Sequence, residues 1–323
     1  MTGLREDGYD VVVIGGGAAG LSGALTLARA RRTVLVIDSG APRNAPAAGV
    51  HGLLGLDGIR PGELLARGRA EVRGYGAELI SAEAAAVTRT GTGFCVRLAD
   101  GRAVRARRLL VASGLADGLP DVPGLREQWG RDVMHCPYCH GWEVRDRAIG
   151  VLATGPLSVH QALLLRQWSA DVVFFPHTEP RPAGEQAAEL AARGIRVVPG
   201  KVTSVLSSGG RLTGVRLADG TEARREVLAV APRMTARAGF LAPLGLAPAE
   251  HPSGAGEHIP ADPAGRTAAP GVWAAGNVTD LAAQVGAAAA AGTVAAAQIN
   301  ADLVAEETRA AAAARPDEAG VPA

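Results

Sequence analysis

A glycine-rich turn between two short apolar runs constrains the fold of this chain more than any other feature. Val11–Ile14 and Thr33–Ile37 both have the continuous apolar pattern of buried parallel strands. Between them lie the glycine-rich turn Gly15–Gly20 and an apolar helical repeat, Leu21–Ala30, and the second run is followed by Asp38. The order of strand, Gly-x-Gly-x-x-Gly, helix, strand and acid is typical of a dinucleotide-binding βαβ unit.

Each position in this turn has a physical reason. Gly15 permits the tight turn, Gly17 lets the backbone approach a pyrophosphate, and Gly20 lets the helix pack closely on the strand. The free N–H groups and the positive dipole at the start of the helix favour phosphate. Asp38 lies where a ribose hydroxyl needs an acceptor. The pattern therefore predicts a bound dinucleotide, and the alternative is a tight turn without a ligand.

A second unit of the same kind follows in the middle of the chain. It consists of an apolar run at Ile149–Leu152, a turn at 153–158, a helical pattern and a further run at Val172–Phe175. The hexapeptide Val96–Gly101 recurs letter for letter as Val215–Gly220, each time among short strands joined by Gly or Asp-Gly turns. These repeats predict an α/β fold with two Rossmann-like dinucleotide-binding domains, each with three layers in ββα arrangement.

The second glycine-rich turn has lost two of its three glycines. Ala153 and Ser158 stand at the first and third glycine positions, and only Gly155 remains. Glu179, after the next strand, places a negative charge where the 2′-phosphate of NADP needs arginines. The pattern favours a domain that keeps its fold and binds no NAD(P)H tightly. Ribose binding by Glu179, which favours NAD, is the alternative.

Between the two units lies a Cys-x-x-Cys pair, Cys136 and Cys139, followed directly by His140. Covalent haem attachment needs an export signal that residues 1–10 do not resemble, and a zinc site needs two more ligands, so the sequence predicts no metal. A structural disulfide that closes so small a ring adds little stability. A reversible dithiol/disulfide couple fits best, with His140 placed to take or give a proton during exchange.

Charge and hydropathy exclude several classes of partner. The chain has 33 basic and 32 acidic side chains, which argues against a nucleic-acid surface. No run of 18 apolar residues predicts a membrane span, and we expect a cytoplasmic protein. The alanine-rich segment Ala287–Ala297 predicts a buried helix, and we expect the tail from Glu306 to Ala323 to fray.

Together these motifs resemble the low-molecular-weight thioredoxin reductase family of FAD-dependent pyridine-nucleotide disulfide oxidoreductases. The resemblance runs from Tyr9 to about Leu303 and also rests on the segments Val111–Gly114 and Gly271–Asn277. It implies FAD as the cofactor and a homodimer. It also implies an FAD-binding domain in two parts, 1–117 and 233–323, with the second, NAD(P)-type domain inserted as residues 118–232 and carrying the cysteine pair.

The resemblance also implies which residues bind FAD. Asn277 stands where the family has an aspartate on the ribityl chain, and its amide can make the same hydrogen bond. Gln284 lies where a helix start comes near the isoalloxazine ring, which Cys139 is expected to face. The implied FAD-binding positions are Gly15, Gly17, Ala18, Ala19, Gly20, Asp38, Ser39, Arg43, Gly114, Gly276, Asn277 and Gln284.

Departures from the reductases point to one subgroup. His140 stands where the reductases have an aspartate, and Cys-x-x-Cys-His-Gly with an aromatic residue and Glu resembles the small-molecule dithiol oxidases of holomycin and gliotoxin type. That resemblance implies that a small dithiol reduces the Cys136–Cys139 disulfide, that the cysteines reduce FAD, and that O2 reoxidises it to give H2O2. The resemblance to the reductases implies a rotation of the two domains that brings the cysteines alternately to flavin and substrate. Where no nicotinamide needs access, we expect this rotation to be unnecessary. The alternatives are an NAD(P)H-dependent reductase of a thioredoxin-like protein and a flavoprotein redox sensor.

Overall fold

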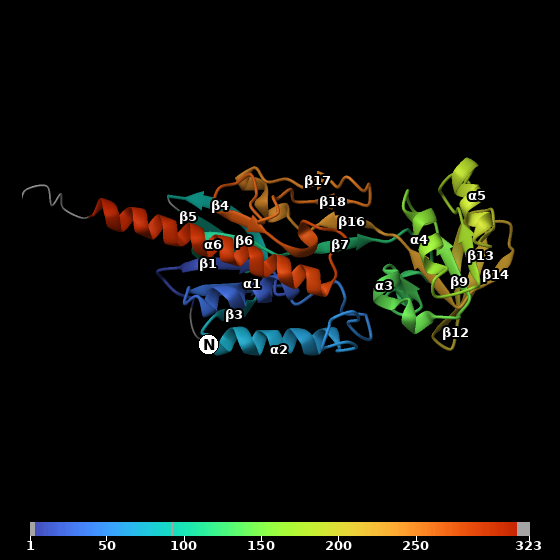
Figure 1. Ribbon diagram of the computed structural model, residues 1–323, viewed down its shortest axis with the longest axis horizontal. Helices are drawn as coiled ribbons and strands as arrows, with labels where there is room; N and C mark the ends of the chain where they lie inside the picture. Colours follow the sequence, from blue (N-terminus) through green and yellow to red (C-terminus); the bar gives the residue numbers. More distant parts are fainter. Residues whose placement is uncertain (1–3, 92, 315–323) are drawn as a thin grey trace, which may run out of the picture.

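The computed structural model describes residues 4–91 and 93–314, which form two sheet-centred halves joined by a narrow pair of strands (Figure 1). The larger half holds both ends of the described chain. The smaller half is built from the middle of the chain. This mixed α/β arrangement with two parallel sheets confirms the predicted fold class.

The larger half is built on a seven-stranded sheet with the order β3-β2-β1-β6-β5-β4, and β19 pairs with β6. The glycine-rich turn follows β1 directly and lies at the carboxyl edge of this sheet, as the βαβ pattern predicts. The parallel strands are β1 (Tyr9–Ile14), β2 (Val34–Asp38), β3 (Glu78–Ser81), β6 (Ala103–Val111) and β19 (Val272–Ala274). The antiparallel strands are β4 (Ala84–Thr90) and β5 (Gly93–Leu98).

Three long helices cover this sheet: α1 (Ala18–Arg29), α2 (Pro61–Gly74) and α6 (Val285–Ala313). Helices α1 and α6 lie side by side (Figure 1) and approach so closely that a Cβ on Gly292 would stand 2.0 Å from the Ala19 carbonyl oxygen. The predicted burial of α6 is only partly correct. Within the predicted segment Ala287–Ala297, Ala288, Ala295 and Ala296 are buried, whereas Val294 is exposed.

The frayed tail predicted from Glu306 onward is wrong for residues 306–313. Helix α6 continues to Ala313, because its acidic side chains pair with arginines of the neighbouring strand. Arg107 donates to Glu306 and Glu307 at 2.8 Å, and the largely buried Arg108 donates to Asp302 at 2.6 Å. Residues 315–323 lie outside the described residues. No described helix is long and apolar enough to cross a membrane.

The smaller half has a five-stranded parallel sheet with the order β11-β10-β9-β15-β8. Its strands are β8 (Val133–Met134), β9 (Ile149–Leu152), β10 (Val172–Phe175), β11 (Arg196–Val197) and β15 (Val227–Val230). Its helices are α3 (Pro137–His140), α4 (Ser158–Leu165) and α5 (Gly184–Ala192). An antiparallel meander of β12 (Val202–Ser208), β13 (Arg211–Leu217) and β14 (Glu222–Arg224) completes it.

The repeated hexapeptide forms the same turn in both halves. Gly101 N–H donates to the Leu98 carbonyl at 3.1 Å, and Gly220 N–H donates to that of Leu217 at 3.0 Å. Both glycines have a positive φ, 89° and 87°. The aspartate before each glycine accepts a backbone N–H two residues further on. The two identical hexapeptides therefore form the same type of turn, as the sequence predicts.

Two antiparallel strands connect the halves, β7 (Leu115–Gly118) and β16 (Arg233–Ala236). The segments by which the chain enters and leaves the smaller half therefore lie side by side. The predicted boundaries between 117 and 118 and between 232 and 233 stay predictions. Short elements complete the chain: η1 (Arg126–Gln128), η2 (Trp142–Val144), η3 (Gly239–Leu244), η4 (Gly276–Val278), β17 (Ala249–Glu250) and β18 (Glu257–His258).

We predict that Gly292→Ala destabilises the protein by about 1–3 kcal/mol, because the added methyl group must push α6 away from α1. Gly62→Ala in α2 is the matched control, since a Cβ there meets nothing within 4 Å. We expect that control to be neutral or stabilising by up to about 1 kcal/mol. Urea denaturation of the three proteins measures both effects, and equal midpoints for Gly292→Ala and the unmodified protein would contradict the close packing.

Candidate active site

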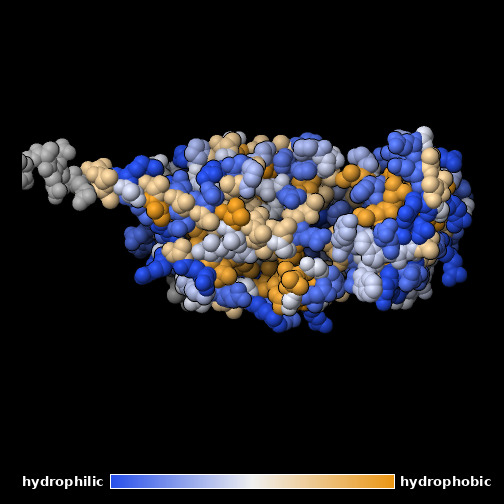
Figure 2. Space-filling view, in the orientation of Figure 1, coloured by the Kyte–Doolittle hydropathy of each residue, from blue (hydrophilic) through white to orange (hydrophobic). Residues whose placement is uncertain are grey.

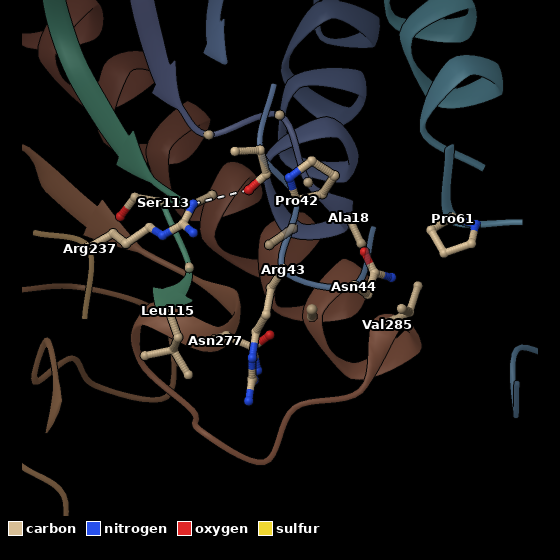
Figure 3. Close-up of a pocket in the computed structure, with 18 of the residues that line it drawn as sticks. Ala18, Pro42, Arg43, Asn44, Pro61, Ser113, Leu115, Arg237, Asn277 and Val285 are labelled. Carbon is tan, nitrogen blue, oxygen red and sulfur yellow. Dashed lines mark hydrogen bonds between the residues drawn. The ribbon is translucent and has the colours of Figure 1, made fainter. Parts of the chain in front are cut away.

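A cavity of about 1080 Å³ opens between the two halves. The larger half contributes the glycine-rich turn, the loop after β2, the end of β6 and the start of α6. The smaller half contributes the segment that carries the cysteine pair. Figure 3 shows the wall of the larger half, where Arg43, Asn277 and Val285 come from three different segments.

Close packing of glycines shapes the floor of the cavity. Gly15 has a φ of +112°, and a Cβ there would stand 2.2 Å from the Ala112 carbonyl oxygen. A Cβ on Gly20 would stand 1.9 Å from the Gly15 carbonyl oxygen. At Gly17, in contrast, a Cβ would meet nothing within 4 Å, and no side chain caps the N-terminus of α1 that follows. The turn therefore leaves a bare helix start on the cavity wall.

Asp38 ends β2 and stands directly over this turn. A Cβ on Gly16 would stand 2.6 Å from the Asp38 Cγ, so the carboxylate needs glycine at that position. Asp38 Oδ2 accepts from Arg69 Nη2 at 2.8 Å, and the ion pair fixes the carboxylate at the cavity. The arrangement leaves the acid close to the turn, as a ribose-binding role requires.

The structure brings most of the predicted FAD-binding residues together. The predicted residues that line the cavity are Gly15, Gly17, Ala18, Ala19, Asp38, Ser39, Arg43, Gly114, Asn277 and Gln284. Gly20 and Gly276 lie behind the wall and serve packing, since a Cβ on Gly276 would stand 2.7 Å from the Ala19 Cβ. The direct role of each residue toward FAD stays a prediction.

Asn277 and Arg43 have partners within the protein. Asn277 Nδ2 donates to the carbonyls of Asp280 at 3.0 Å and Ala283 at 2.9 Å, so its Oδ1 is the atom left to accept a ligand hydroxyl. Arg43 forms a bidentate pair with Asp117 of β7, with contacts of 2.6–3.0 Å. Because this carboxylate balances its charge, Arg43 ties the loop after β2 to the connecting strand as well as lining the cavity.

The cavity wall fits a dinucleotide such as FAD. The bare start of α1 offers backbone N–H groups to a pyrophosphate. Ser113 Oγ is buried at the end of β6 without a hydrogen-bond partner among the described residues, and Ser113 lines the cavity. A bound ligand with hydroxyl or carbonyl groups would supply the missing partner.

The cysteine pair lies at the start of a short helix, as its spacing predicts. Cys136 is the N-cap of α3, and Pro137 occupies the first turn, where its missing N–H costs nothing. Cys136 and Cys139 form a disulfide with their Cα atoms 5.3 Å apart, and the Cys139 N–H donates to the Cys136 Sγ at 3.2 Å. Both cysteines line the cavity. The redox pair therefore faces the same space as the glycine-rich turn.

Two histidines flank the disulfide on the cavity wall. Burial lowers the pKa of His140, nearby Glu143 raises it, and His51 lowers it. Burial also lowers the pKa of His135, and the Arg43 charge adds to this effect. Both imidazoles are therefore neutral near pH 7, and a neutral His140 can take a proton from a thiol.

His51 and His135 are candidate site residues that the sequence did not reveal, and Glu143 entered only as part of the Cys-x-x-Cys-His-Gly motif, without a role. His51 Nε2 stands 3.5 Å from Glu143 Oε1 and joins a loop of the larger half to the turn after α3. Neither residue has a diagnostic spacing, because the contact forms only when the two halves meet. For His135 the available signal was its place directly before the first cysteine.

The second glycine-rich turn is closed by its own side chains. Ser158 is 1% exposed, and its Oγ accepts the Thr154 N–H at 3.1 Å. Thr154 Oγ1 donates to the Ala231 carbonyl at 2.6 Å. The Thr154 N–H of this turn is therefore bound within the protein, although α4, like α1, has no side-chain cap at its start.

Comparisons with known proteins identify the family. The family model described as pyridine nucleotide-disulphide oxidoreductase matches residues 9–296, so the chain belongs to this family. The chain is 32% identical over 283 residues to thioredoxin reductase tcpT of Claviceps purpurea, covering 83% of this chain and 86% of that protein. It is 31% identical over 291 residues to thioredoxin reductase sirT of Leptosphaeria maculans, with the same coverage.

A solved structure agrees with this assignment. The crystal structure of HlmI matches with a TM-score of 0.91 at 48% identity and covers 97% of this chain and 98% of that chain. The predicted resemblance is thus confirmed, and the protein is an FAD-dependent oxidoreductase of thioredoxin reductase type. Its family acts on thiols and disulfides, which agrees with the Cys136–Cys139 pair.

We predict that Gly17→Asp abolishes FAD binding and leaves the fold intact. The added side chain has room in the protein, but it places a negative charge where the pyrophosphate binds, and we expect at least about a tenfold loss of affinity. Gly155→Asp is the matched control, since a Cβ there also meets nothing within 4 Å. The flavin absorbance per protein measures the effect, and equal FAD content in both variants would contradict it.

We predict that the free energy of unfolding falls as the pH is lowered from about 7 to about 5. Burial lowers the pKa of His135, His140 and His177 below their ordinary value of 6.5, so the unfolded chain binds more protons in this window. Their stability contribution is present above 6.5 and is lost as the pH falls through the lowered pKa values. Urea denaturation measures it, and His135→Gln should flatten the dependence more than His160→Gln at an exposed site.

Proposed function

We propose that this protein is a dithiol oxidase that forms a disulfide in a small-molecule dithiol. One contrast carries the proposal: the cavity with the intact glycine-rich turn also holds the redox disulfide, whereas in the second turn Ser158 replaces a glycine and binds a backbone N–H. A protein that receives electrons from a substrate dithiol has no need of a nicotinamide site. The likeness to HlmI and to the holomycin and gliotoxin subgroup supports the same direction.

The cysteine chemistry balances without an outside reagent. His140 takes the proton of the first substrate thiol, and the resulting thiolate attacks Cys136 Sγ. The Cys136–Cys139 bond breaks, and its electron pair leaves on Cys139 Sγ as a thiolate. After His140 has released the first proton to solvent, it takes the proton of the second substrate thiol. The resulting thiolate attacks the substrate sulfur bound to Cys136, which closes the substrate disulfide and releases Cys136 as a thiolate.

FAD, held by the residues around the Gly15–Gly20 turn, would supply the acceptor for the electron pair of the reduced cysteines and the group from which O2 would take that pair to give H2O2. The half-buried start of α3 favours the thiolate forms, because the N–H groups and dipole of the helix stabilise negative charge. The proposal includes a homodimer and small dithiol as substrate, following the family resemblance.

The halves touch on the cavity wall, where a Cβ on Gly130 would stand 2.5 Å from the Pro46 Cβ, and further contacts hold the connecting strands to the larger half. The Arg43–Asp117 pair ties β7 to the loop after β2, and its side chains are 24% and 10% exposed. Arg237, next to β16, donates to the Ala41 carbonyl at 3.1 Å, a bond drawn in Figure 3. Both connecting strands are therefore held to the larger half, and we propose that the domains do not rotate during catalysis.

An NAD(P)H-dependent reductase is the second candidate. The names of the fungal relatives, thioredoxin reductase tcpT and sirT, favour it. In that case electrons enter from a nicotinamide and leave to a disulfide of a thioredoxin-like protein. The two candidates differ in which reagent reduces the flavin.

We predict that an anaerobic dithiol, such as dithiothreitol, bleaches the flavin and that NADPH and NADH do not. Admission of air should restore the colour with about one H2O2 per dithiol oxidised, because oxidation of a dithiol by O2 transfers one electron pair. Cys139→Ser is the control and should stay coloured in dithiol. Rapid bleaching by a nicotinamide would make the protein a reductase and refute the proposal.

A further inference from the structure

His51 lies in a compact loop that no motif of the sequence singles out. Backbone hydrogen bonds of 2.8 Å join Val50 and Ile59 and also Val50 and Gly58, so the loop closes on itself. Asp57 Oδ1 accepts the Gly52 N–H at 2.8 Å across the loop. A Cβ on Gly49 would stand 3.0 Å from His51 Nε2, so glycine leaves room for the ring. The loop thus holds the imidazole in one place.

Both ring nitrogens of His51 face carboxylates. Nδ1 stands 3.5 Å from Asp57 Oδ2, and Nε2 stands 3.5 Å from Glu143 Oε1. The side chains are 68% exposed at Asp57, 24% at His51 and 31% at Glu143. The three groups therefore run from solvent into the interface between the halves. Glu143 belongs to the half that carries the cysteine pair, and His51 belongs to the other half.

Glu143 in turn lies close to His140. It follows three residues after His140, in the turn that continues α3, and its charge favours the protonated imidazole. The other charged groups that face His140 are His51, Asp132 and Arg147. Asp132 already pairs with Arg211 at 3.0 Å and contacts Arg147 at 3.6 Å. Glu143 is thus the carboxylate best placed to act on His140.

We propose that His51 is a positioning residue for the redox centre: it holds the Glu143 carboxylate beside His140. The carboxylate then stabilises the proton that His140 takes from the attacking thiol. Orientation of a base by a third group is a general device of nucleophilic sites, and here the third and fourth groups come from opposite halves of the molecule. The inference rests on the proposed function only for the nature of the attacking thiol.

The test uses His51→Leu, which removes the contact, and His51→Gln, whose amide can still donate to Glu143. The pH titration of His140 is followed by NMR in the FAD-loaded protein with labelled histidines, and His140→Gln assigns its signal. Removal of His51 by itself would raise the pKa of His140, because His51 lowers it. Movement of the Glu143 carboxylate away from His140 would instead lower that pKa. We expect His51→Leu to lower the pKa, as Glu143→Gln does, and His51→Gln to restore it.

Kinetics give a second measurement. We expect anaerobic flavin bleaching by dithiothreitol to slow roughly tenfold in His51→Leu and in Glu143→Gln, with no further loss in the double variant. His160→Gln, at an exposed site of α4, is the matched control for both measurements. A raised or unchanged pKa of His140 in His51→Leu would overturn the inference. Failure of O2 to reoxidise the unmodified protein would refute the oxidase while this result stands.

Discussion

The close approach of α1 to its neighbours is the constraint on which the rest of the structure depends. Glycine at 15, 20 and 292 lets the turn, the helix and α6 pack at distances that a single methyl group would prevent. This packing brings the uncapped start of α1 to the cavity wall. An uncapped helix start costs free energy unless something satisfies its N–H groups, and a phosphate does so well. The binding site is thus a consequence of the packing.

Under the proposed function, the second turn shows how small a change in sequence can remove a dinucleotide site. Its strand and helix keep the same frame, but Ser158 places a hydroxyl where the first turn has the hydrogen of Gly20. That hydroxyl binds the Thr154 N–H from inside, so the backbone donor is already satisfied. A nicotinamide dinucleotide would have to replace a hydrogen bond that the fold already makes.

Local patterns predicted much of the fold and of the site, because each depends on residues close together in the chain. The βαβ units, the twin Asp-Gly turns and the cysteines at a helix start are of this kind. The errors and omissions involve partners far apart in the sequence. The helix over residues 306–313 was not predicted, because the arginines that pair with its acidic side chains, Arg107 and Arg108, lie far away in the sequence. His51 was not singled out, because its contact with Glu143 forms only in the folded protein. The spacing of residues along the chain does not indicate which distant side chains will pair in the folded protein.

The contacts between the halves also bear on the direction of electron flow. A reductase that alternates between nicotinamide and substrate must break and remake the interface beside its cysteines in every turnover. Here the bidentate Arg43–Asp117 pair holds the connecting strand β7 to the larger half, and breaking it would leave a nearly buried carboxylate without a partner. An enzyme that receives electrons from a small dithiol keeps its cysteines at one cavity throughout. Under the proposed function, this pair holds the connecting strand in place while His140 and the disulfide stay at the cavity.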